Sequence, residues 1–441
     1  MIKILNTKDS NFENEFNILL NRASEDMDSI IPSVLETLKD IKKRGIDSIL
    51  ELVAKYDSWN PKSLECLKID FNHAENAYKN LDSKSKDALK IAYDRIYTFH
   101  EYTKPRGFIK NDNYANTLGQ IVLPVSRAGL YVPGGKAFYP SSLLMNAIPA
   151  KVAGVQNIVV TTPTPRNEIN ELLLAAMYLC DIKEAYKVGG VGAIGLLAYG
   201  LGDKKWRTNA TQDSKSVRKV DVITGPGNIY VATAKKLVFG EVNIDMIAGP
   251  SEIGILADRS APIDTLAIDM LSQAEHDELA SSILITDDAL LATQVATKID
   301  KKLATLTRRE IAEKSINSRG VIIVVENLKQ GAALMNEIAP EHLEIITQNP
   351  LDLLPRIKAA GAIFLGRYTP EAIGDYLAGP NHTLPTGGSA KFFSPLSSEN
   401  FSTRTSLLSF TKDGLESLRE ACATIADIEG LQAHKLSVLH R

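Results

Sequence analysis

The sequence contains little cysteine, no long apolar run and no marked excess of either charge. Only three cysteines, Cys66, Cys180 and Cys422, occur in 441 residues. They are far apart and odd in number, which excludes a disulfide framework and is typical of a reducing compartment. The longest apolar run, residues 172–180, is far shorter than the roughly 20 residues that a membrane-spanning helix needs, and the first ten residues lack the apolar core of a signal peptide. We therefore expect a cytoplasmic protein without a membrane partner.

The charges nearly cancel. Lys and Arg number 50 and Asp and Glu number 53, which gives a formal net charge of −3. Proteins that bind nucleic acid generally carry a basic excess, so a nucleic-acid partner is disfavoured. The apolar share of 44% and the charged share of 23% are ordinary for a folded protein. A chain of this length can form two or three domains with a large core.

The apolar pattern divides the chain into four parts. Residues 1–130 carry apolar side chains at helical spacing and predict a helical N-terminal region, which we expect to pack with the second α/β unit. Short β-rich runs alternate with helical stretches over 131–250 and again over 251–396. This alternation predicts an α/β fold of two Rossmann-like, doubly wound domains. Residues 397–441 form a short helical tail, and the polar stretch 202–219 is expected to be a surface loop.

Two glycine-rich turns follow β-rich runs in the first of these units. GVGAIG at residues 190–195 has the spacing of a dinucleotide-binding turn, but the same glycines also suit close packing in an ordinary strand-to-helix turn. The packing interpretation is favoured, because no acidic residue follows on a clear second strand about 20 residues later. YVPGG at residues 131–135 could direct backbone N–H groups at an anion, with Tyr131 stacked on a flat ring, or could be a plain loop.

A third feature is the helical segment LSQAEH at residues 271–276. Gln273 and His276 are three residues apart and therefore neighbours on one helix face, where they could chelate a divalent ion. The alternative is a helix C-terminus, where the helix dipole favours a histidine.

Glutamate, histidine and aspartate occur in two further turn-like segments. In APEHLE, residues 339–344, Pro340 suits the first turn of a helix, and Glu341 and His342 could exchange protons near neutral pH. A surface turn is the alternative there. In GDYLAGPNH, residues 374–382, the aspartate could belong to a ligand loop or simply cap a local turn.

Together these segments resemble the histidinol dehydrogenase family. The resemblance spans nearly the whole chain in the expected order, and the segments that carry it are residues 129–135, 140–155, 225–230 (GPGNIY), 249–252 (GPSE), 271–276, 339–344, 369–385 and 429–434. It implies an NAD-dependent enzyme that oxidises L-histidinol through L-histidinaldehyde to L-histidine, reducing two NAD, in the last steps of histidine biosynthesis.

The resemblance also implies the functional residues. One zinc ion per subunit would be held by Gln273, His276, Asp375 and His434, with His434 supplied by the partner subunit of a homodimer. The tail 397–441 would thus complete the partner's site. Glu341 and His342 would do the proton work. Substrate contacts would come from the zinc ligands and from Ser251, His342 and Glu429, and NAD contacts from Tyr131, Asn228 and the position of Gly192.

Two departures from the family pattern stand out. Gly192 occupies a position where the family commonly has a glutamine that contacts NAD, so NAD affinity could differ. The stretch 202–219 is longer than expected. Two alternatives remain. One is a homologous zinc and NAD dehydrogenase of another small alcohol, such as a sulfonated diol, and the other is a catalytically silent metal-binding homologue. Glu341, His342 and the four zinc-ligand positions argue against the silent homologue.

Overall fold

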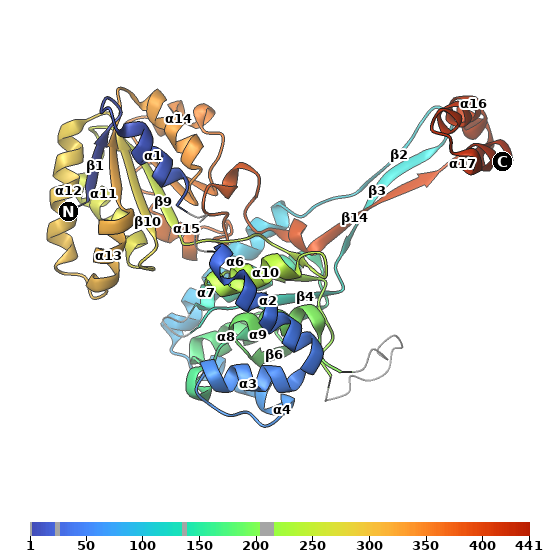
Figure 1. The fold of residues 1–441 in the computed structure, drawn as a ribbon, viewed down its shortest axis with the longest axis horizontal. Coiled ribbons are helices and arrows are strands. Elements are labelled where there is room, and N and C mark those ends of the chain that lie inside the picture. Colours follow the sequence, from blue (N-terminus) through green and yellow to red (C-terminus); the bar gives the residue numbers. More distant parts are fainter. Residues whose placement is uncertain (1, 23–26, 135–138, 203–215) are drawn as a thin grey trace.

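A computed structural model of the chain describes residues 2–22, 27–134, 139–202 and 216–441. Two α/β units lie side by side, and a long arm projects from them to a pair of helices at the C-terminus (Figure 1). The expected α/β class is confirmed, because both units are built on parallel sheets.

The first unit has a five-stranded parallel sheet in the order β6-β5-β4-β7-β8. Neighbouring residues on a strand point to opposite faces: Leu130 and Val160 pack under α7 and α8, whereas Val159 and Ile223 pack under α9 and α10. Burial of both faces explains the continuous apolar runs in these strands. The strands are β4 (Arg127–Tyr131), β5 (Asn157–Thr162), β6 (Glu184–Lys187), β7 (Val222–Thr224) and β8 (Asn243–Ile244), and the helices are α7 (Pro140–Ala153), α8 (Glu171–Leu179), α9 (Gly190–Tyr199) and α10 (Ile229–Val238).

The second unit has a six-stranded parallel sheet in the order β1-β11-β10-β9-β12-β13. Helices α11, α12 and α13 cover one face, and α14 and α1 cover the other. The strands are β1 (Lys3–Asn6), β9 (Glu252–Ala257), β10 (Ser281–Thr286), β11 (Val321–Val324), β12 (His342–Ile346) and β13 (Ala362–Leu365), and the helices are α1 (Phe12–Leu20), α11 (Ile263–Ala274), α12 (Ala289–Leu303), α13 (Arg309–Arg319), α14 (Leu328–Ile338) and α15 (Glu371–Tyr376).

The N-terminal region divides between the two units, which differs from the expectation that residues 1–130 pack with the second. Only β1 and α1 join the second sheet. The helices that follow pack on the first unit: α2 and α3 lie against α9 and α10, and α5 and α6 lie against α7 and α8. The bounds are α2 (Met27–Arg44), α3 (Ile46–Tyr56), α4 (Leu64–Leu67), α5 (Phe71–Asn80) and α6 (Ser83–Tyr102).

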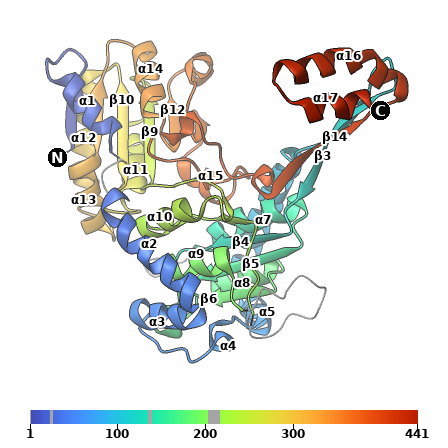
Figure 2. The ribbon, with the colours of Figure 1, turned by 45° about the vertical axis from the view of Figure 1, so that its right-hand side comes forward.

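The arm is an antiparallel ribbon that carries two helices at its end (Figure 2). Strand β3 (Thr117–Pro124) pairs with β2 (Phe108–Asn111) on one side and β14 (Ser402–Ser409) on the other. Helices α16 (Lys412–Ile428) and α17 (Gln432–Leu439) follow. The C-terminal part is thus more than a helical tail, and residues 120–124 belong to the arm rather than to an α/β sheet.

Pro340 does not begin a helix as the sequence suggested. Helix α14 ends at Ile338, Ala339 adopts a left-handed conformation, and the chain enters strand β12 at His342. This strand lies between β9 and β13, and all five of its residues are buried. The Pro-Glu-His segment therefore marks the start of a central strand.

Two sequence features lie partly outside the described residues. Most of the polar stretch 202–219 (residues 203–215) and Gly135 of the second glycine turn are not described. In the described part of the chain, no helix is both long and apolar enough to cross a membrane. Short 3-10 helices occur at Pro165–Asn167, Pro350–Asp352, Leu354–Arg356, Ser389–Lys391 and Ser398–Phe401.

Candidate active site

The polar cluster of the second unit lies at the amino edge of its sheet. Strand β9 begins at Glu252 and β12 begins at His342, and the two strands run parallel with His342 opposite Ile253. Helix α11 returns to this edge and ends at Ala274, one residue after Gln273. Side chains from three distant segments therefore meet where β9 and β12 begin.

Gln273, His276 and Asp375, three of the expected metal ligands, come together here with Glu371. One donor atom each of His276, Glu371 and Asp375 lies within 4.8 Å of the others. Gln273 is fully buried, and its hydrogen bonding assigns the amide nitrogen as donor to both carboxylate oxygens of Glu371, at 2.6 and 3.3 Å. Nitrogen and oxygen donors at this spacing suit a divalent transition metal such as zinc.

Glu341 and His342 lie beside this cluster, and both are buried. Glu341 Oε2 accepts a hydrogen bond from the backbone N–H of Glu252 at 2.9 Å. His342 Nδ1 lies 3.1 Å from the carbonyl oxygen of Glu252, and His342 Nε2 lies 3.5 Å from Asp375 Oδ1. The two expected catalytic side chains thus leave the chain next to each other and contact different backbone atoms of Glu252.

The electrostatics of the cluster shift the pKa values of its carboxyl and imidazole groups away from their ordinary values. Burial raises the pKa of Glu341 to about 8. Burial alone would lower the pKa of His342, but the carboxylates of Glu371, Glu341 and Asp375 outweigh it and raise that pKa well above its usual value. Burial lowers the pKa of His276, which favours the neutral imidazole that a metal requires. Perturbed carboxyl and imidazole groups in one cluster are typical of a catalytic site.

Two ring nitrogens in the cluster have no hydrogen-bond partner among the described residues. They are Nε2 of His342 and Nε2 of His382. His382 interacts electrostatically with Asp375, so the third histidine that the sequence singled out lies at the same site. Buried nitrogen atoms are normally hydrogen-bonded, and two unpartnered ones indicate space for a ligand or metal.

The loop after α15 connects this edge to the first unit. Asn381 donates from Nδ2 to the carbonyl oxygen of Met145 at 2.5 Å, and Asn146 donates to Thr383 Oγ1 at 3.4 Å. Ser251 lies in the turn just before β9, and its carbonyl oxygen accepts from the N–H of Ser281 at 3.0 Å. The cluster therefore lies where the two units meet.

In the first unit, two of the three expected NAD residues lie at the carboxyl edge of the sheet. Tyr131 ends β4, and its hydroxyl accepts a hydrogen bond from the N–H of Gly190 at 3.3 Å. Asn228 caps α10 by accepting from the N–H of Val231 at 3.2 Å. This edge is where open parallel sheets bind ligands.

The turn before Asn228 is held by a buried ion pair. Lys235 pairs with Asp245, Lys235 Nζ donates to the carbonyl oxygen of Gly225 at 2.9 Å, and Asp245 Oδ2 accepts from the N–H of Gly225 at 2.8 Å. Gly225 has a φ of 117°, and a Cβ there would lie 2.0 Å from the Tyr131 carbonyl oxygen. Only glycine fits, which explains the GPGN sequence.

Gly192 lies inside α9 and is buried. A Cβ added there would lie 3.3 Å from Val188 Cγ1 and 3.5 Å from Leu52 Cδ1. At Gly195, three residues on, an added Cβ would lie 2.6 Å from Ile41 Cδ1. Gly195 thus lets α9 pack closely on α2, which favours the packing interpretation of GVGAIG.

Glu429 and His434 are not near the cluster within this chain. Both are exposed and lie at the end of the arm, Glu429 after α16 and His434 in α17 (Figures 1 and 2). The structure of one chain thus brings together three of the four expected metal ligands.

Several buried acids of the site were not identified from the sequence. Glu371 is one of them, and it lies four residues before the expected ligand Asp375 on α15. This helical spacing was the sequence signal that could have identified it. Glu344 accepts from the N–H of Glu371 at 2.9 Å and fixes the start of α15 on β12. Burial raises the pKa of Glu344 to about 9 and that of the neighbouring Asp269 to about 6. An acid in a central strand has no local sequence signature.

Known proteins give the family. The family model described as histidinol dehydrogenase matches residues 20–441. A histidinol dehydrogenase of Wolinella succinogenes is 56% identical over 440 residues, covering 100% of this chain and 99% of the relative. The one of Sulfurimonas denitrificans is 56% identical over 432 residues, covering 98% and 97%.

This chain belongs to the histidinol dehydrogenase family. The crystal structure of histidinol dehydrogenase from Elizabethkingia anophelis superimposes with a TM-score of 0.89 at 30% identity, covering 99% of this chain and 97% of that one. The expected family and activity are confirmed: the chain is an enzyme, an NAD-dependent oxidoreductase of the histidinol dehydrogenase type.

Proposed function

We propose that the chain converts L-histidinol to L-histidine in two oxidations at the cluster of the second unit, with one zinc ion per subunit. Gln273, His276, Asp375 and His434 of the partner subunit would hold the zinc. The observation that carries this proposal is the convergence of His276 and Asp375 donor atoms within 4.8 Å, beside buried Gln273. When bound, zinc would orient the amine and imidazole nitrogens of histidinol, both of which are suited to it.

In the first oxidation, His342 would remove the proton of the substrate hydroxyl while the carbinol carbon gives a hydride to NAD. The Nε2 atom of His342 suits this role, because it is buried and has no hydrogen-bond partner among the described residues. The product of this step is L-histidinaldehyde. Ser251 lies in the turn at the same edge, and we assign it a substrate contact.

In the second oxidation, Glu341 would take a proton from water as the water attacks the aldehyde. The hydrate would then give its hydride to a second NAD and become the carboxylate of L-histidine. The raised pKa of Glu341 places proton exchange near neutral pH, as a general base requires. This route uses no thiol, and Cys180, the buried free cysteine, lies at the end of α8.

NAD would bind at the carboxyl edge of the first sheet, beside Tyr131 and Asn228. The turn held by Lys235 and Asp245 presents Asn228 there, and helix N-termini favour anionic phosphates. The family commonly has a glutamine that contacts NAD at the position of Gly192, and glycine has no side chain to make this contact. We therefore expect an NAD affinity different from that of family members with the glutamine.

We further propose a homodimer in which each arm completes the other subunit's site. Glu429 and His434 lie on a part of the chain that exposes several large apolar side chains: Leu418, Ile425, Ile428, Leu431, Leu436 and Leu439. Apolar surface of this kind marks an interface. The free cysteines, with Cys66 and Cys422 exposed, suit a cytoplasmic location.

Counting NADH per histidinol tests the proposal directly. We expect two NADH for each L-histidinol consumed, loss of turnover in a chelator, and recovery on adding zinc. One NADH with release of aldehyde would contradict the two-step assignment. NADH formation from another small alcohol, with none from histidinol, would contradict the substrate.

A further inference from the structure

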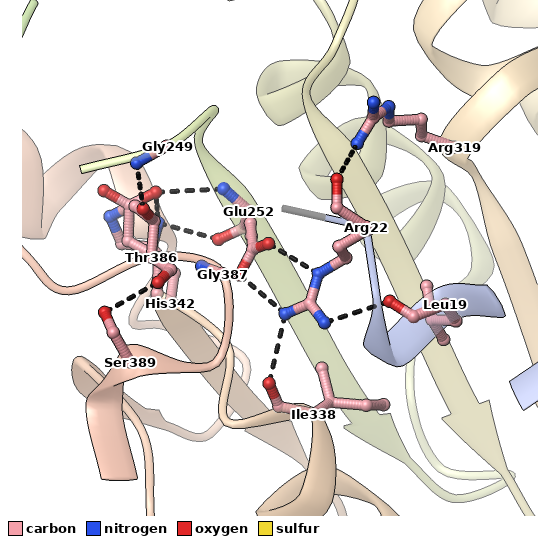
Figure 3. A network of polar contacts seen from close by, with 11 residues as sticks. Leu19, Arg22, Gly249, Glu252, Arg319, Ile338, His342, Thr386, Gly387 and Ser389 are labelled. Carbon is pink, nitrogen blue, oxygen red and sulfur yellow. Dashed lines mark hydrogen bonds and ion pairs between the residues drawn. The ribbon is translucent and has the colours of Figure 1, made fainter. Parts of the chain in front are cut away.

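The backbone of a single residue, Glu252, contacts both proposed catalytic side chains. The N–H of Glu252 donates to Glu341 Oε2 at 2.9 Å, and its C=O lies 3.1 Å from His342 Nδ1 (Figure 3). A carbonyl oxygen only accepts, so His342 Nδ1 must carry the hydrogen of this bond. The lone pair that can take a proton from substrate is therefore on Nε2, on the side of Asp375.

The side chain of Glu252 is held by Arg22. Arg22 Nε donates to Glu252 Oε1 at 2.6 Å and Arg22 Nη2 to Glu252 Oε2 at 2.9 Å, and the N–H of Gly387 adds a bond of 3.1 Å. The Arg22 and Glu252 side chains are only 6% and 3% exposed. Two parallel bonds from one guanidinium fix both the position and the plane of the carboxylate.

Arg22 is itself tied to three parts of the second unit. It donates to the carbonyl oxygens of Leu19 and Ile338, both at 3.1 Å, and its own carbonyl oxygen accepts from Arg319 at 2.8 Å. Ile338 ends α14, just before the segment that carries the proposed catalytic pair. In Figure 3 the bonds to Leu19 and Ile338 start from the Arg22 guanidinium, whereas Arg319 reaches the Arg22 carbonyl oxygen.

We propose that Arg22 and Glu252 are positioning residues that hold Glu341 and His342 in their reactive orientation. The proposal rests on the catalytic roles assigned above. A buried ion pair adds little net stability compared with well-packed apolar side chains. The Arg22–Glu252 pair is therefore not needed merely to attach the N-terminal segment to the second unit. A fixed Glu252 backbone, by contrast, orients an imidazole through its C=O and a carboxylate through its N–H, and small displacements of such groups reduce rates strongly.

Steady-state kinetics of the full-length zinc-loaded enzyme test this proposal. We expect Arg22→Met to lower kcat by about 10- to 100-fold with KM for histidinol within about threefold, because orientation rather than binding is disturbed. Arg22→Lys should recover part of kcat, since it keeps the charge without the fork. If Arg22→Met fails to fold, Glu252→Gln, which keeps the shape and loses the charge, serves instead with the same expectation for kcat.

A matched control is the buried pair of Arg127 and Glu184 at the opposite edge of the first sheet, whose side chains are 5% and 19% exposed. Arg127→Met should lower the unfolding temperature while leaving kcat unchanged. If Arg22→Met, or Glu252→Gln in its place, lowers the unfolding temperature as much but keeps wild-type kcat, the pair is only structural and the proposal is wrong. If Glu341→Gln and His342→Gln themselves keep wild-type kcat, the catalytic assignment fails instead.

Discussion

The proposed zinc ligands come from two regions that differ sharply in burial. Gln273 is fully buried in the body of the molecule, and Asp375 lies close by in a cluster of carboxylates and imidazoles. His434 is exposed at the end of a thin antiparallel ribbon. Under the proposed assignment, the body contains an incomplete site and the arm carries the residues that complete it in the partner subunit. The proposal therefore predicts that catalysis depends on association as well as on folding.

The largest expected effect comes from removing one ligand in each region. His276→Ala and His434→Ala should each weaken zinc binding by more than about 100-fold and abolish most turnover, because substitutions that only support a ligand already weaken binding 10- to 100-fold. Chelator competition and NADH production measure the two effects.

Mixing these two inactive variants tests whether the body and the arm of one site come from different subunits. After the subunits exchange, heterodimers should contain one wild-type site each, so about one quarter of all sites should regain activity. A mixture of two body variants, His276→Ala and Asp375→Ala, is the negative control, because both ligands come from the same chain and no heterodimer then contains an intact site. Recovery in the control, or none in the first mixture, would contradict a shared site.

The next effect concerns the body alone. Glu341→Gln should slow oxidation of L-histidinaldehyde by about 10²- to 10⁴-fold, the usual contribution of a general base, and slow oxidation of histidinol much less. Single-turnover measurements with each substrate give the two rates. Equal losses in both steps would show that Glu341 does not act on water specifically.

A smaller effect is expected on the surface of the arm. Ile428 is 80% exposed, and burying an isoleucine is worth about 1.5 to 3 kcal/mol, so Ile428→Ser should weaken dimerisation by about tenfold or more. Activity should then fall on dilution and return at high protein concentration. The control is Ile18→Ser, at a 68% exposed position on α1, which should leave dimerisation and activity unchanged.

The smallest effect concerns the pH dependence of the body. His100 is fully buried on α6, and burial lowers its pKa to about 4. Between that value and an unfolded pKa near 6.5, the unfolded chain binds more protons, so the free energy of unfolding falls as pH drops. The loss should be on the order of 1 to 3 kcal/mol.

Denaturant unfolding at pH 7 and pH 4.5 measures this loss. His100→Gln should remove the part of the pH dependence that His100 contributes, whereas His440→Gln, at an exposed position on the arm, should leave the pH dependence as in the wild type. An unchanged pH dependence in the His100 variant would show that other groups control acid stability.

The buried strands were the most predictable part of the fold. Runs such as residues 252–257 and 281–286 are apolar throughout because both faces of a parallel sheet are covered. The proposed metal ligands Gln273, in α11, and His276, just after its end, were predicted from their spacing and from the family resemblance.

The failures were non-local. Pro340 predicted a helix start, but pairing of β12 with β9 and β13 overrode that local preference. Residues 120–124 have the β-rich composition of a strand, and nothing in them specifies a partner on the arm such as Thr403, which pairs with Leu123. Arg22 and Glu252 are 230 positions apart, so no spacing rule joins them.

Strand β1 has a consequence for the order of synthesis. Lys3 to Asn6 pair with Val321 to Val324, so β1 can pair with its neighbour only after most of the polypeptide has been made. The first unit lies between these two strands in the sequence and can fold before they pair. We therefore expect that chains truncated before residue 321 expose their amino-terminal residues to proteases. We also expect that the long-range pairing of β1 with β11 limits the rate of refolding.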